Sequence, residues 1–158
     1  MGGRKMQQTK EAMGTILSDL REKDAFAIVT FESSTQSWSP SLVPANQENV
    51  ADARGYIRDL QDAGATNLHQ GLVGAMDILE EAKDNAISTA GTFDLIITLT
   101  DGMPNTGQIS DAEGIKTDIR RWLEGRFSLF CLGFGEGVRY PFLEQLALQN
   151  KGLATQDL

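Results

Sequence analysis

The chain has 158 residues, a formal net charge of −8 at pH 7 and an apolar fraction of 41%, which suits one domain with one buried core. Its 14 basic and 22 acidic residues are dispersed, so the composition does not support a nucleic-acid-binding or anionic-membrane surface. One cysteine and one histidine exclude an internal disulfide framework and a zinc site built from several Cys and His ligands. Neither an apolar run near the ~20 residues of a membrane span nor a signal peptide is evident. The chain as given is therefore expected to be cytosolic, or a piece of a longer exported chain.

A helix and a strand are predicted first. Between Lys5 and Leu20 apolar residues recur at helical spacing, which predicts an amphipathic helix. Ala25 to Phe31 is almost wholly apolar and predicts a buried strand. Gln36 to Ser39 can form a short edge strand before Pro40 and Pro44 break the pattern.

Two helices are predicted next, joined by a short polar loop at residues 62–67. Asn46 can cap the first of them, and Thr66 or Asn67 can cap the second. The apolar faces of the two helices comprise Val50, Ala53, Ile57 and Leu60 in the first, and Leu68, Leu72, Ala75, Met76, Leu79 and Ala82 in the second.

The stretch from Phe93 to Gly102 organises the predicted fold. Leu95 to Leu99 is apolar on both faces apart from Thr98, which is typical of a central strand covered by helices on both sides. Asp101 follows at the carboxyl end of this strand, where open α/β sheets place their ligands. Asp101 and Gly102 can equally form an ordinary turn.

The remaining segments continue the alternation of helices and strands. Ser110 to Glu113 predicts a capping box that opens a helix, Phe127 to Leu132 a buried strand, and Pro141 the start of another helix. Leu153 and Ala154 can begin a last strand. This order predicts an α/β fold with an open, mostly parallel, doubly wound sheet and helices on both faces.

Thr66 and Asp101 are the candidate metal ligands. They lie on two separate loops that this topology delivers to the same edge of the sheet. A hydroxyl and a carboxylate are hard oxygen ligands of the kind that Mg²⁺ or Mn²⁺ takes. Two ligands are too few, so a site needs further oxygens from a third loop, expected just before the first helix.

Three other features are weaker candidates. The glycines from Gly133 to Gly137 hint at a phosphate loop but lack the spacing of one. His69 is expected to be a solvent-facing polar residue rather than a ligand or base. Cys131 is central in an apolar strand and is expected to be an unreactive buried residue.

Several separated motifs resemble the von Willebrand factor type A domain, in particular that of the inter-alpha-trypsin inhibitor heavy chains. The resemblance covers nearly the whole chain and rests on several separated motifs, so chance does not explain it. The stretches that carry it are Gly3 to Thr9, Ser41 to Ala45, Gly64 to Asn67, Leu99 to Gly102, Ser128 to Gly135 and Phe142 to Leu148.

The resemblance implies a metal-ion-dependent adhesion site with Thr66 and Asp101 as ligands of Mg²⁺ or Mn²⁺. The family's first ligand motif, Asp-x-Ser-x-Ser, is missing, and Met1 matches the methionine that follows it in the heavy chains. The resemblance therefore implies that residues 1–158 are a von Willebrand factor type A domain truncated at both ends. It also implies that the central first strand is absent, which leaves two apolar strands with unpaired edges. Met103 stands where heavy chains commonly carry an acidic residue.

The implied function is that of a non-enzymatic, extracellular binding module from a secreted heavy chain. Such chains are linked to serine-protease inhibition and to hyaluronan metabolism and matrix stabilisation. The implied partners are protein ligands or matrix components such as hyaluronan-associated complexes, without nucleic acid and without a membrane span. One alternative is an α/β enzyme that uses Asp101 in metal-assisted phosphoryl transfer, which predicts a lysine or a glycine-rich cradle beside Asp101; residues 101–107 supply neither. Another is a metal-free scaffold.

Overall fold

A computed structural model describes residues 3–61, 65–85, 93–101, 104–105, 110–124, 126–135 and 139–157. Helices and strands alternate along the second half of the chain, as the sequence predicts. The helices are α1 (Arg4–Asp19), α2 (Gln47–Asp59), α3 (Leu68–Asp84), α4 (Ala112–Leu123) and α5 (Tyr140–Leu148). The strands are β1 (Ala25–Phe26), β2 (Val29–Phe31), β3 (Thr35–Ser37), β4 (Val43–Pro44), β5 (Leu95–Thr100), β6 (Ser128–Phe134) and β7 (Ala154–Asp157).

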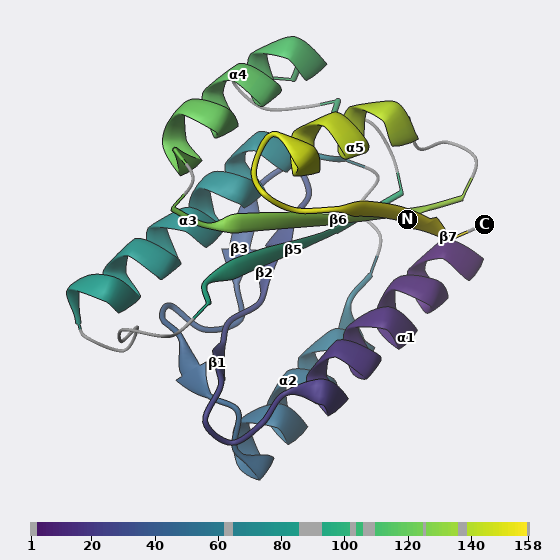
Figure 1. Ribbon diagram of the computed structural model, residues 1–158. Coiled ribbons are helices and arrows are strands. Elements are labelled where there is room, and N and C mark those ends of the chain that lie inside the picture. Colours follow the sequence, from purple (N-terminus) through teal and green to yellow (C-terminus); the bar gives the residue numbers. More distant parts are fainter. Residues whose placement is uncertain are drawn as a thin grey trace.

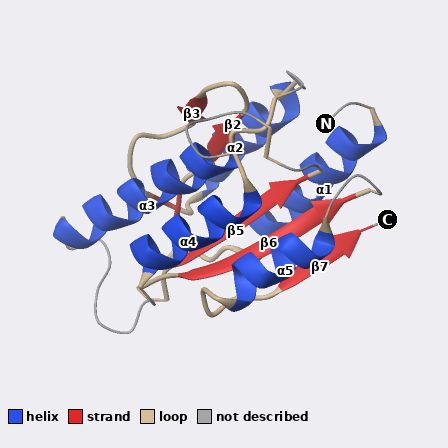
Figure 2. Cartoon of the chain, turned by 90° about the horizontal axis from the view of Figure 1, so that it is seen from above, coloured by secondary structure: helices blue, strands red, loops and turns tan. Residues whose placement is uncertain are grey.

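The main sheet is parallel, with the strand order β5-β6-β7. Helix α4 connects β5 to β6, and α5 connects β6 to β7, so each connection is a strand–helix–strand crossover. Figures 1 and 2 show α4 and α5 over one face of this sheet and α1 on the opposite side. The predicted α/β class, with a parallel sheet and helices on both faces, is confirmed.

Two antiparallel strand pairs, β1 with β4 and β2 with β3, precede the main sheet, where the sequence predicted one long strand. Ala25 and Phe26 pair with β4, whereas Val29 to Phe31 pair with β3. Because these partners differ, the predicted strand from Ala25 to Phe31 is divided into β1 and β2, and its prediction as one strand is wrong. Pro44, expected to break the pattern, lies in the two-residue strand β4.

Side-chain caps begin three of the helices. Asn46 caps α2 by accepting a 2.8 Å hydrogen bond from the backbone N–H of Asn49, as predicted. Asn67, rather than Thr66, caps α3. Asp111 caps α4 by accepting a 2.7 Å bond from the N–H of Gly114. The prediction of a capping box with Ser110 as the cap is therefore wrong, because Gly114 at the third helical position has no side chain to complete a box.

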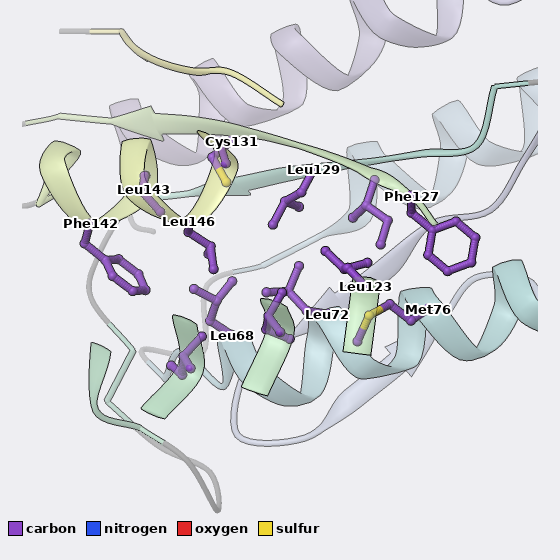
Figure 3. Packing of buried hydrophobic residues seen from close by; sticks show 14 of the residues in the cluster. Leu68, Leu72, Met76, Leu123, Phe127, Leu129, Cys131, Phe142, Leu143 and Leu146 are labelled. Carbon is purple, nitrogen blue, oxygen red and sulfur yellow. The ribbon is translucent and has the colours of Figure 1, made fainter. Parts of the chain in front are cut away.

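The larger core cluster lies between the main sheet and helices α3, α4 and α5. In Figure 3 side chains from α3, β6 and α5 point toward one another across this space. Burying a large apolar side chain stabilises a fold by roughly 1.5–3 kcal/mol, so this cluster is the main stabilising unit. Its members are Leu68, Leu72, Met76, Leu79, Ile96, Ile115, Ile119, Leu123, Phe127, Leu129, Cys131, Phe142, Leu143, Leu146 and Ala147.

A second, smaller cluster joins α1, α2 and β1. The rings of Phe26 and Trp38 stack in it with centroids 5.2 Å apart. Leu17 comes from α1, and Ala53 and Ile57 come from α2. This cluster fixes α1 to α2. The first turn of α1 lies at the carboxyl edge of the main sheet, where Lys5 contacts Asp101.

The outer edge of β5 departs from the sequence prediction. Among the described strands only β6 pairs with β5, so β5 is an edge strand rather than the central strand that its apolar run predicts. Its second edge has no partner among these strands, which agrees with the unpaired edge that the resemblance implies. Leu95 is 45% exposed and Ile97 is 36% exposed, whereas Ile96, on the other face, is 8% exposed. The expected burial on both faces is wrong because α1 packs against β6 and α2, while the face bearing Leu95 and Ile97 is less covered. None of the described helices has the length and apolarity that crossing a membrane requires.

Candidate functional site

The carboxyl edge of β5 and β6 is the candidate site, because the loops that carry Thr66 and Asp101 meet there. Thr66 lies just before α3, and Asp101 directly follows β5. Asn105 joins their loops: the backbone N–H of Thr66 donates to Asn105 Oδ1 at 2.8 Å, and the N–H of Asn105 donates to the Thr66 carbonyl at 3.1 Å. The structure therefore places the two loops side by side, and the ligand role of Thr66 and Asp101 stays a prediction.

A third loop, after β2, is tied to the same place. The backbone N–H of Asn67 donates to the carbonyl of Glu32 at 2.9 Å. The side chain of Asn67 is 4% exposed and accepts a bond from the N–H of Gln70 at 3.3 Å. These contacts fix the backbone on the amino-terminal side of α3, and with it the position of Thr66.

Lys5 is the residue of this edge that motif reading did not single out. Its ammonium lies 3.7 Å from Asp101 Oδ2, with side-chain exposures of 37% for Lys5 and 18% for Asp101. The aliphatic part of Lys5 runs close to Gly135, at the end of β6: a Cβ on Gly135 would lie 2.7 Å from Lys5 Cε. Lys5 thus crosses the carboxyl ends of both strands.

Where the third loop is expected, the described residues begin with Gly3 and α1, and Lys5 in the first turn of α1 lies beside Asp101. Within the described residues, no three His, Cys, Asp or Glu side chains come together as a group that could hold a metal ion. Met1, Gly64, Gly102 and Met103, to which the resemblance also refers, lie outside the described residues.

His69 contacts a neighbouring helix and is not the solvent-facing residue that the sequence predicts. Its Nε2 atom lies 2.6 Å from Asp118 Oδ2, and its side chain is 13% exposed. Because His69 is on α3 and Asp118 is on α4, the pair links these helices. The glycine stretch is described only in part; Gly135 has φ +77°, and Gly137 lies outside the described residues.

Cys131 is expected to react with a disulfide reagent such as DTNB far more slowly in the folded protein than in urea. The residue is 1% exposed in the middle of β6, and burial raises the pKa of its thiol from 9.0 to about 12. The thiolate, which is the reactive form, is therefore scarce near neutral pH. Since the folded-state pKa is the higher one, the stability due to this group is fully present below about pH 9 and is lost as the pH rises toward 12. Equal rates in buffer and in urea would contradict this expectation.

Comparison with known proteins gives one consistent family. The family model for the von Willebrand factor type A domain matches residues 1–156. Inter-alpha-trypsin inhibitor heavy chain H4 of Homo sapiens is 44% identical over 154 residues, which are 98% of this chain and 16% of that protein. Heavy chain H3 of Bos taurus is 40% identical and is covered to 17% of its length. The chain thus spans a small part of these relatives.

Solved structures show the same fold at lower identity. A von Willebrand factor type A protein from Catenulispora acidiphila has a TM-score of 0.83 at 23% identity, with 98% of this chain and 35% of that chain covered. Proximal thread matrix protein 1 from the mussel byssus, described with a zinc-occupied MIDAS motif, has a TM-score of 0.68 at 19% identity, covering 97% and 39%. The manganese-loaded TRAP protein of Plasmodium vivax has a TM-score of 0.67 at 14% identity, covering 94% and 59%. These likenesses agree with the resemblance in the sequence motifs.

Proposed function

Because the chain belongs to the von Willebrand factor type A domain family, with inter-alpha-trypsin inhibitor heavy chains among its relatives, we propose that it is a non-enzymatic binding module. Its ligand-binding surface is the carboxyl edge of β5 and β6, with Mg²⁺ or Mn²⁺ bound through Thr66 and Asp101. The observation that carries the proposal is the pair of hydrogen bonds through which Asn105 joins the loops of Thr66 and Asp101. Domains of this family and the heavy chains are generally adhesion or binding modules.

The side-chain oxygens at this edge are of the kind that a hard divalent cation prefers as ligands. Asp101 supplies a carboxylate that is 18% exposed and already faces the positive charge of Lys5, and Thr66 supplies a hydroxyl. Magnesium and manganese ions commonly keep several waters, so the remaining ligands are water and an oxygen of the bound partner. When bound, the cation supplies positive charge that attracts a partner's carboxylate. Two structural relatives, one with a zinc-occupied MIDAS motif and one loaded with manganese, support the choice of a divalent cation.

The broader role is proposed for the whole protein to which such a domain belongs. The similarity to heavy chains H4 and H3 supports the proposal that the whole protein is secreted, extracellular and linked to serine-protease inhibition. Its partners are protein ligands or matrix components such as hyaluronan-associated complexes. This chain corresponds to 16% of heavy chain H4. Of the broader role, we therefore assign only cation-dependent binding to this domain.

One observation bears on the phosphoryl-transfer alternative. Lys5, from outside the loop of Asp101, provides the neighbouring lysine that such an enzyme needs. The only histidine of the chain, His69, contacts Asp118 instead of this edge. If the protein is such an enzyme, wild type hydrolyses p-nitrophenyl phosphate with Mg²⁺ and Asp101→Asn does not. If it is a binding module, neither wild type nor Asp101→Asn hydrolyses this substrate.

Mn²⁺ titration calorimetry tests the cation site. Wild type is expected to bind Mn²⁺, and Asp101→Asn to bind it at least about tenfold more weakly, because a charged hard ligand becomes a neutral amide. Asp19→Asn is the matched control, since it removes the same charge at the last residue of α1, roughly 21 Å along the helix from Lys5. The control should bind like wild type. Equal binding by Asp101→Asn and wild type would refute Asp101 as a ligand.

A further inference from the structure

The ammonium of Lys5 holds a position at Asp101 that a divalent cation would also need. The ion-pair distance is 3.7 Å, and two positive charges beside one carboxylate repel each other. Lys5 lies in the first turn of α1, which begins at Arg4, and its side chain also approaches Gly135 at the end of β6. The first turn of the helix therefore faces the ends of β5 and β6.

Gly135 leaves the room in which the side chain of Lys5 lies. A Cβ at this position would lie 2.7 Å from Lys5 Cε and 3.5 Å from Cδ, and the positive φ of +77° also favours glycine. The ammonium of Lys5 is thus brought to Asp101 along a path defined by β6. This contact is independent of the ion pair and shows that the stem and the charged end of Lys5 are both accommodated at this edge.

The ion pair is of a kind that a stronger cation can displace. Lys5 is 37% exposed and Asp101 is 18% exposed, and partly exposed pairs of this type contribute little to stability. The ammonium of lysine is carried by a flexible aliphatic chain, so it can move into solvent while the aliphatic part stays packed. The ion pair can therefore form and break without disturbing the packing around it.

We propose that Lys5 is an internal counter-cation of Asp101 that competes with the divalent cation and so sets the affinity of this edge for metal. The inference rests on the proposed function and adds its regulation. With Lys5 at Asp101 the carboxylate is neutralised without metal; when a divalent cation binds, Lys5 turns toward solvent. Metal occupancy is thereby coupled to the first turn of α1.

The test is Mn²⁺ titration calorimetry on wild type, Lys5→Met, Lys10→Met and the double variant Lys5→Met/Asp101→Asn. Lys10→Met is the matched control, because it removes the same charge from the same helix, where Lys10 Nζ donates to the Arg58 carbonyl at 2.6 Å. Lys5→Met is expected to bind Mn²⁺ about tenfold more tightly than Lys10→Met. The double variant is expected to lose that gain.

The outcomes separate this inference from the proposed function. If Lys5→Met and Lys10→Met bind equally while Asp101→Asn does not bind, the competition is refuted and the cation site stands. If none of the proteins binds Mn²⁺, including Lys5→Met, both proposals fail. Should Lys5→Met not fold, Mg²⁺ is titrated into wild type whose lysines carry ¹³C-methyl groups: a shift of the Lys5 signal on binding supports the competition, and binding without a shift overturns it.

Discussion

Replacing Gly152 by alanine is expected to lower the free energy of unfolding by more than about 3 kcal/mol, or to prevent folding. A Cβ on Gly152 would lie 1.5 Å from the carbonyl oxygen of Leu129 and 2.4 Å from its carbonyl carbon. These are backbone atoms of β6, next to a Leu129 side chain that is fully buried. Relief of the clash requires β6 and the turn after α5 to separate, because neither backbone can give way alone.

The contacts around Gly152 explain why separation is unfavourable. The N–H of Gly152 donates to the Ala147 carbonyl at 3.0 Å, and the N–H of Leu129 donates to the Asn150 carbonyl at 3.1 Å. Moving the turn away from β6 therefore breaks backbone hydrogen bonds in a buried region, which is costly when the groups find no other partner.

Urea denaturation followed by circular dichroism measures this effect. Gly55→Ala is the matched control, because a Cβ at Gly55 meets only the end of the Arg58 side chain at 4.0 Å. Gly55 lies within α2, where alanine is favoured over glycine by up to about 1 kcal/mol. Gly55→Ala should therefore be as stable as wild type or more so. A stability of Gly152→Ala within about 1 kcal/mol of wild type would contradict the close backbone contact.

The sequence predicts local features of this fold better than long-range contacts. The caps at Asn46 and Asn67 and the strands β5 and β6 follow from capping chemistry and apolar runs, which act over a few residues. The close approach of Gly152 to β6 depends on how α5 packs. The local sequence does not distinguish Gly152 from any other glycine in a turn. The division of residues 25–31 into β1 and β2 likewise depends on which strands become their partners.

The candidate site shows the same limit. Thr66 and Asp101 are predicted by motif and by their place on loops that lead to the carboxyl edge of the sheet, and their role as ligands stays a prediction. Asn105 and Lys5 were missed as partners of these residues because both contacts join segments far apart in the chain. The available signals were the position of Lys5 at the start of the first predicted helix and that of Asn105 in the loop of Asp101.

Ile96 and Ile97 provide the sharpest test of which face of β5 is buried. They are identical, adjacent residues whose side chains point to opposite faces of the sheet. Ile96 is 8% exposed and belongs to the larger core cluster, whereas Ile97 is 36% exposed. An apolar run alone cannot distinguish them, because periodicity does not reveal which face a helix covers.

Ile96→Ala is expected to lower the free energy of unfolding by about 2–4 kcal/mol, since it removes buried methylene groups and leaves a cavity. Ile97→Ala is expected to lower it by about 1 kcal/mol or less, because its side chain already contacts water and loses less burial. Urea denaturation of both variants at one protein concentration measures the difference. Equal losses would show that the face of β5 bearing Leu95 and Ile97 is covered in solution. A dependence of those losses on protein concentration would then identify association between chains as the source of the cover.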